Sequence, residues 1–239
     1  MRKKRLIINT LNKLKSGIKC LLLLLLLTFN NTGFAQSEAE QAQGSWLVFM
    51  NQHRFNTKLT ALTDIQHRSW EFAQNFNQLL LRSTLYYPLN SEFGLGLGYG
   101  YIATDSSFET LEDEKNSSEH RLHGDLIFTR GFSHGAWINR YRFEQRYLSN
   151  DADGYDSSQR VRYMSRINYN LTSKFSLSVF DEVFLNLQRP VFSQNRLYFG
   201  MGYQASKLLN IQLGFMKNHF SNANFNRVMV TLWYNTSSI

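Results

Sequence analysis

Along most of its length the sequence alternates between two kinds of residue with a period of two. Between Phe93 and Tyr101 every second residue is aromatic or leucine, and each residue between them is glycine. Successive side chains of a β-strand point to opposite faces, whereas one face of a helix recurs about every 3.6 residues. The alternation therefore predicts strands, and we expect an all-β chain.

The alternating segments are long for strands. They run for about 10 to 13 residues, against five or six in a common globular strand, and a tilted strand needs roughly 9 to 11 residues to cross a bilayer. We count eleven candidates between Gly44 and Asn235, of which Trp46–Phe55 is the first. Bacterial single-chain barrels normally have an even number of strands. Either Trp46–Phe55 lies outside the wall, or another candidate contains two strands or none, so we predict ten to twelve strands.

The connections between these segments alternate between short and long. The short ones are Pro88–Ser91, Gly131–Gly135, Leu171–Lys174 and Lys207–Asn210, and the long polar ones are Asp105–Ser118, Ser149–Ser158 and Gln188–Gln194. Short periplasmic turns and long external loops are typical of outer-membrane barrels. We predict an antiparallel transmembrane β-barrel, with Trp46, Trp70, Trp137 and Tyr147 as candidates for its interfacial aromatic girdles. The alternative is a soluble periplasmic β-protein, whose apolar face would turn inward.

The first 35 residues have the composition of a signal peptide. Four basic residues follow Met1, the apolar run Leu21–Leu27 comes next, and Gly33-Phe34-Ala35 places small residues at the −3 and −1 positions of a cleavage site. A short amphipathic or spanning helix is the alternative. We predict that residues 1–35 are cleaved, that residues 36–239 form the barrel domain, and that the protein resides in the cell outer membrane. Cys20 lies within the leader, so the mature chain has no cysteine.

The net charge of the whole chain is misleading. It is +8, from 26 Lys and Arg against 18 Asp and Glu. Removing the seven basic residues of the leader leaves 19 basic against 18 acidic residues, a net charge of +1. Because the basic excess belongs to the leader, we predict no nucleic-acid partner.

Charged residues recur on the polar side of several predicted strands. Arg140, Arg142, Glu144 and Arg146 share one face of their strand. Facing lipid, each arginine would cost about 2–4 kcal/mol at the bilayer midplane, so we expect these residues to point inward. The predicted lumen-lining set is Arg82, Arg121, Asp125, Arg140, Arg142, Glu144, Arg146, Arg160, Arg162, Arg166 and Glu182. These side chains either hold a narrow barrel closed as pairs or form a constriction that attracts a small anionic solute.

The stretch Lys217–Ala223 offers an enzymatic alternative. Its His-x-Ser-Asn-Ala order is similar to a motif of lipid A 3-O-deacylases, which implies His219 as base and Ser221 as nucleophile. That family also uses a carboxylate to orient the histidine, and residues 222–239 contain no Asp or Glu. The alternative is a polar strand end that enters a short Asn-rich loop. Elsewhere no histidine pair has metal-ligand spacing with a supporting carboxylate, so we predict neither metal nor cofactor.

The order of several weak motifs resembles one exported family of Gram-negative bacteria, the family known as domain of unknown function 2490. The motifs are Trp46, Asn56-Thr57-Lys58, Arg68, the glycine-alternating Phe93–Tyr101, Glu119–Leu122, Asn139–Arg146, Arg160–Arg166, Leu213–Met216 and Trp233-Tyr234. The resemblance implies an outer-membrane barrel without an assigned activity. We expect a structural or narrow-pore barrel that is not an enzyme. Its expected partners are outer-membrane lipid, lipopolysaccharide and the barrel assembly machinery.

Overall fold

The computed structural model describes residues 37–108, 116–150 and 154–238. The predicted leader, residues 1–35, and part of the acidic connection after Asp105 lie outside these ranges. Ser37–Ile239 forms one compact unit.

The described chain is a succession of strands preceded by one short helix. The helix α2, Glu38–Gln41, begins after Ser37, whose side chain forms a reciprocal capping box with Glu40. The strands are β1 Gln43–Arg54, β2 Thr60–Glu71, β3 Gln74–Pro88, β4 Phe93–Asp105, β5 Asn116–Phe132, β6 Gly135–Asn150, β7 Gly154–Asn170, β8 Phe175–Asn186, β9 Phe192–Gln204, β10 Leu209–His219 and β11 Asn224–Ser237. In the described part of the chain, no helix is long and apolar enough to cross a membrane.

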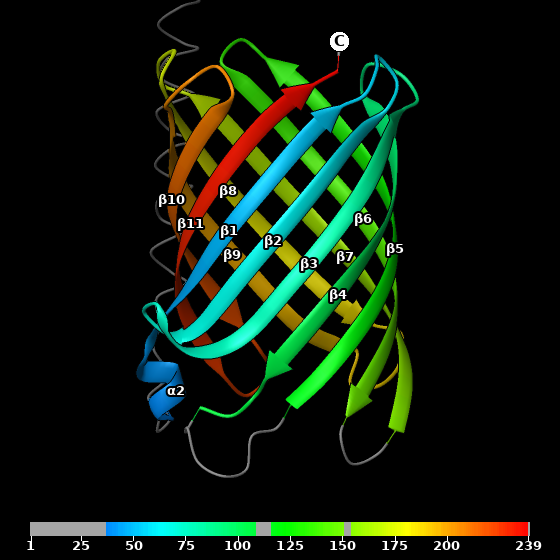
Figure 1. The fold of residues 1–239 in the computed structure, drawn as a ribbon, viewed down its shortest axis with the longest axis vertical. Coiled ribbons are helices and arrows are strands. Elements are labelled where there is room, and N and C mark those ends of the chain that lie inside the picture. The colour runs from blue at the N-terminus through cyan, green and yellow to red at the C-terminus, as the bar shows by residue number, and fades with distance from the viewer. Residues whose placement is uncertain (1–36, 109–115, 151–153, 239) are drawn as a thin grey trace, which may run out of the picture. The chain divides into compact units, whose positions relative to one another are not determined.

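Eleven strands close into one barrel (Figure 1). Each strand pairs antiparallel with the next along the chain, and β1 pairs in parallel with β11, with Trp46 opposite Met229. The predicted barrel is confirmed, and its eleven strands fall within the predicted range of ten to twelve, but the prediction of a wholly antiparallel wall was wrong. In a meander with an odd number of strands, the first and last strands run in the same direction, so the closing pair must be parallel. Trp46–Phe55, in doubt from the sequence, falls largely in β1 and belongs to the wall.

The connections predicted as long lie at one end of the barrel. This end also carries α2, and the C-terminus lies at the opposite end (Figure 1). The α2 end has a short turn as well, Phe72-Ala73 between β2 and β3, and the connections predicted as long are shorter than expected. The predicted loop Ser149–Ser158 is mostly strand, because β6 extends to Asn150 and β7 begins at Gly154. The polar residues at the end of β6 and at the start of β7 were mistaken for loop.

Side chains that accept hydrogen bonds from the backbone shape the short turns. The Oδ1 atom of Asn56 accepts from the amides of Lys58 and Leu59, and Asn90 accepts in the same way from the two residues that end its turn. The hydroxyls of Thr172 and Ser206 play the same role in later turns. These local bonds favour a tight reversal over continuation of the strand.

The apolar face of the strands is the outer one. Leu97 of β4 is 72% exposed and Leu213 of β10 is 60% exposed, whereas Arg142 and Glu144 of β6 are 1% and 0% exposed. The same parity holds around the wall, as the exposed residues Leu47, Ile65, Leu81, Leu126, Ile167, Val179, Phe199 and Leu232 show. The arrangement is the reverse of a soluble barrel, whose apolar residues fill the interior.

One sector of the interior is apolar nevertheless. Trp46, Met164, Phe180, Tyr198 and Met216 form a buried cluster that also includes Val48. The tyrosine fits because glycine faces it on two strands: a Cβ atom on Gly200 or Gly214 would overlap its ring.

The prediction of interfacial girdle residues is wrong for two of the four. Trp46 is 6% exposed and Trp70 lines an interior cavity, while Trp137 and Tyr147 do lie outside, 41% and 42% exposed.

Candidate functional site

The arginine-rich strands β6 and β7 are neighbours, and their register brings the charged positions together. Arg142 lies opposite Arg162, and Glu144 lies opposite Arg160. Because side chains alternate between the two faces of a strand, these even-numbered positions all point into the barrel. Like charges directly opposite one another are unfavourable, so the carboxylates between them determine whether the arrangement is stable.

Glu144 is the centre of the largest ion-pair cluster. Its Oε2 atom accepts hydrogen bonds from Arg160, and Arg160 NH2 lies 2.7 Å away. Its Oε1 atom accepts from Arg162 NH1 at 2.7 Å and lies 3.7 Å from Arg121. One buried carboxylate therefore offsets part of the charge of three guanidiniums.

Glu182 of β8 extends this cluster across the next strand. Its Oε1 atom accepts from Arg162 NH2 at 2.7 Å and from Arg140 NH2 at 2.8 Å. Arg162 thus joins Glu144 to Glu182, and the ion pairs form a continuous chain over β6, β7 and β8. Pairing of this kind offsets the cost of burying these charges.

A separate pair joins β5 to β6. Arg142 donates to both carboxylate oxygens of Asp125, at 2.6 and 2.7 Å, and the hydroxyl of Tyr86 donates to the same carboxylate at 2.8 Å. Two parallel hydrogen bonds are the strongest geometry for this pair. The glycine face of β4 leaves room nearby, because a Cβ atom on Gly98 would overlap the His123 ring.

The sequence prediction omitted two carboxylates. Glu119 accepts from Arg121 and Arg146, at 2.6 and 2.8 Å. Asp64 accepts from Arg82 at 2.8 Å. Both lie on the inward parity of their strands, and this position was the signal that could have identified them. With these two included, each arginine of the predicted lumen-lining set except Arg166 has an ion-pair partner. The partners are Asp64, Glu119, Asp125, Glu144 and Glu182.

Four arginines of the barrel interior that have no carboxylate partner among the described residues lie against aromatic rings. Arg68 is 3.8 Å from the centre of the Trp46 ring, and Arg166 is 4.7 Å from that of Phe180. Arg196 lies over Trp46 and Phe184, and Arg227 lies over Trp70 and Phe225. Arg68, Arg196 and Arg227 were missed as site residues because no run of charged neighbours marks them.

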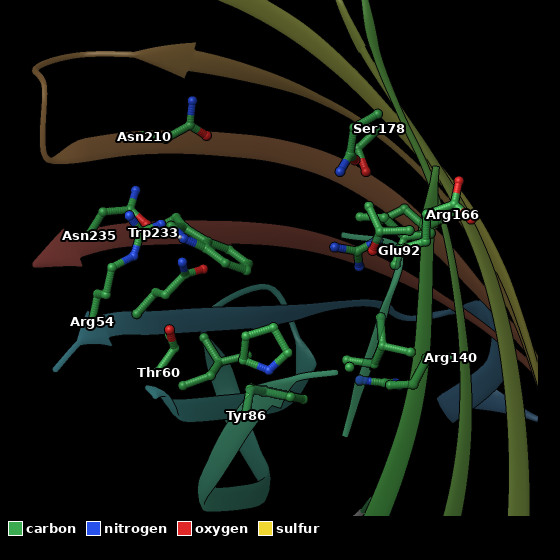
Figure 2. A pocket seen from close by; sticks show the side chains of 18 of the residues that line it. Arg54, Thr60, Tyr86, Glu92, Arg140, Arg166, Ser178, Asn210, Trp233 and Asn235 are labelled. Atoms are coloured by element: carbon green, nitrogen blue, oxygen red, sulfur yellow. Dashed lines mark hydrogen bonds between the residues drawn. The ribbon is translucent and has the colours of Figure 1, made fainter. Parts of the chain in front are cut away.

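A larger and a smaller cavity lie inside the described barrel. The larger, about 920 Å³, has a wall rich in Asn, Gln, Ser and Thr, and Figure 2 shows Tyr86, Arg140, Arg166 and Ser178 among its lining side chains. The smaller, about 530 Å³, contains most of the arginines together with the buried aromatic residues. The residues that line both cavities, and thus separate them, are Leu62, Arg140, Met164, Arg166 and Trp233.

The residues of the enzymatic alternative lie apart from this interior. His219 ends β10, so Ser221 falls in the following turn and the two do not share a strand. The imidazole Nδ1 of His219 is 2.6 Å from Oδ1 of Asn224, and no hydrogen bond joins His219 to Ser221 among the described residues. In the ranges that the structure describes, no three His, Cys, Asp or Glu side chains form a group that could hold a metal ion.

Comparison with known proteins is informative at the level of family alone. No curated protein and no solved structure matches the chain. A family model described as "Protein of unknown function (DUF2490)" matches residues 43–229, from the start of β1 into β11. The match covers most of the closed barrel, including the strands that carry every ion pair described above. The chain therefore belongs to the DUF2490 family.

Proposed function

We propose that the barrel spans the bacterial outer membrane. The support is the polarity of its wall, which exposes leucine, phenylalanine and valine outside and keeps arginine and glutamate inside. A closed barrel satisfies its backbone hydrogen bonds within the wall, which a bilayer requires. Outer-membrane lipid and lipopolysaccharide are then the partners of the outer surface, and residues 1–35 are the export signal.

Insertion is tested by gel mobility and fractionation. The folded protein in detergent is expected to migrate differently before and after heating, to remain with the outer-membrane fraction, and to begin at Gln36. A soluble protein without a heat-dependent shift would contradict the proposal.

Within the membrane, we propose that the interior is a narrow passage that favours anions. The observation that supports this passage is an excess of positive charge in the barrel interior. The inward arginines are Arg68, Arg82, Arg121, Arg140, Arg142, Arg146, Arg160, Arg162, Arg166, Arg196 and Arg227, and the buried carboxylates are Asp64, Glu119, Asp125, Glu144 and Glu182. Rings of arginine favour anions in pores. The two cavities approach each other from opposite ends and share five lining residues, so the partition between them is thin.

Reversal potentials across a planar bilayer under a salt gradient test this passage. We expect small conductance steps with a reversal potential of the sign that chloride permeation gives. Arg166 lies in the partition, so Arg166→Ala should raise the conductance and reduce the anion preference, whereas the exposed Arg130→Ala should change neither. Absence of channel events in heat-modifiable protein would refute the passage and leave a purely structural barrel. No contact of His219 or Ser221 favours a second, enzymatic function.

A further inference from the structure

The smaller cavity has an uneven distribution of charge. The arginines from β5, β6 and β7 at its wall are mostly tied to carboxylates, as described above. Arg68, Arg196 and Arg227, from β2, β9 and β11, have no carboxylate partner among the described residues. Arg68 donates only to glutamines, and Arg227 donates only to a backbone carbonyl. One side of the cavity therefore carries guanidiniums that no described carboxylate pairs with directly, although Glu182 lies opposite Arg196 in the β8–β9 register.

Two of these arginines share one aromatic ring. The guanidinium carbons of Arg68 and Arg196 lie 3.8 and 4.9 Å from the centre of the Trp46 ring. Cation–π contacts stabilise each guanidinium singly, but they leave the repulsion between the two charges in place. In an interior of low dielectric constant, an anion placed near both would relieve this repulsion.

Polar atoms without a protein partner lie in the same wall. They are Nε of Arg196, Nε1 of Trp46, Oε1 of Gln194 and Oδ1 of Asn218, all buried within the described protein. Gln194 and Asn218 are 6% and 4% exposed. Buried polar atoms are rarely left without a hydrogen bond, so this group indicates a position for a polar ligand. The Trp46 donor beside the two guanidiniums favours a negatively charged polar end, whereas the amide oxygens of Gln194 and Asn218 are acceptors and need a donor from the ligand or from water.

Part of the cavity wall is apolar. Phe180, Phe184, Met216 and Met229 line it, and the first three are 6%, 1% and 1% exposed. The volume of about 530 Å³ lies within the range of small-molecule sites. An inorganic ion would use the arginines and leave this surface uncovered.

We infer that the smaller cavity binds an organic anion with one acidic head group and a compact apolar body. The head group accepts hydrogen bonds from Arg68 and Arg196, and the body packs against Phe184 and Met216. This site goes beyond the passage proposed above and does not depend on it, because a barrel that conducts nothing can still bind the ligand.

Calorimetric titration of the full barrel in a non-ionic detergent tests the inference. Phenyl phosphate is the probe, with inorganic phosphate as head group alone and benzyl alcohol as body alone. We expect phenyl phosphate to bind about tenfold or more tightly than inorganic phosphate, and benzyl alcohol to give no measurable heat of binding. Equal affinity for the two phosphates, or no binding of phenyl phosphate, would overturn the inference.

Variants assign the binding to this cavity. Arg68→Gln and Arg196→Gln should each weaken phenyl phosphate binding about tenfold or more, since each removes a charged donor. Arg130→Gln, an exposed arginine outside the cavity, should bind like the unmodified protein. Unchanged affinity in both cavity variants would place the probe elsewhere and refute the site. Where a variant loses its heat-dependent gel shift, the comparison of probes on the unmodified barrel decides alone. These titrations are independent of the bilayer recordings, so either proposal can fail without the other.

Discussion

At the scale of single residues, Glu144 shows how a barrel interior rich in arginine remains folded. Its side chain is fully enclosed, and Arg160 and Arg162 each approach it to 2.7 Å. Removing one partner of a buried ion pair is much more harmful than replacing the pair, because the remaining charge stays buried without compensation. The Glu144 carboxylate therefore contributes more to the stability of the barrel than one exposed charge would, because several buried guanidiniums depend on it.

The substitution Glu144→Gln is expected to lower the free energy of unfolding by about 3 to 5 kcal/mol. Urea titration of the folded barrel, followed by gel mobility, measures the change. Glu92→Gln is the matched control, because Glu92 is an exposed residue in the turn between β3 and β4, and it should change stability by less than about 0.5 kcal/mol. Equal effects of the two substitutions would show that the buried ion pairs do not stabilise the barrel.

At the scale of elements, the short helix α2 is held to the barrel by one carboxylate. The amide of Asn224, at the start of β11, donates to Oε1 of Glu40 at 2.8 Å. Together with the amide of Ser37, this bond holds the pKa of the Glu40 carboxyl below its ordinary value of 4.5. A carboxyl whose pKa is lower in the folded state contributes stability above its ordinary pKa and loses it as the pH falls through the lowered value.

Exchange of the Asn224 amide proton should therefore depend on Glu40. We expect protection at neutral pH that declines below about pH 4.5, once the slowing of intrinsic exchange in acid is corrected for. Glu40→Gln should show weaker protection at neutral pH and no such decline, whereas Glu38→Gln should behave like the unmodified chain. An identical pH profile in Glu40→Gln would contradict the contact.

The strands themselves were largely predictable from the sequence, because the period of two is a local property of each segment. Which side of a segment faces inward was also predictable wherever arginine and leucine alternate. The burial of Trp46, Phe184 and Tyr198 inside the barrel was not predictable. They lie on the same strand face as charged residues, and no local signal distinguishes an aromatic residue that packs inside from one at the membrane interface. The strand partner of β1 depends on the whole count of strands, which single segments do not reveal.

At the scale of the whole molecule, the parallel pairing of β1 with β11 closes the barrel. Phe49 lies opposite Leu232 on the outer face of this pair. Cysteines at these two positions should form a disulfide, since neighbouring strands lie within the range that a disulfide bridges. Phe49→Cys combined with Val228→Cys is the control, because Val228 is four residues out of register. Cross-linking in a Cys20→Ser chain, read as altered mobility on a non-reducing gel, should occur in the first pair alone. No cross-link between positions 49 and 232 would show that β1 does not pair with β11 in the wall.

A barrel inserted in the outer membrane, as we propose, has its apolar outer surface against lipid and its polar interior in water. Spin labels on single cysteines, in a Cys20→Ser chain reconstituted into bilayers, measure this directly. Labels at Leu97→Cys and Leu213→Cys, on the outer face, should collide with oxygen more than with a water-soluble nickel complex. A label at Ser178→Cys, in the wall of the larger cavity, should show the reverse order. Greater access of the nickel complex to both outer positions would contradict the account.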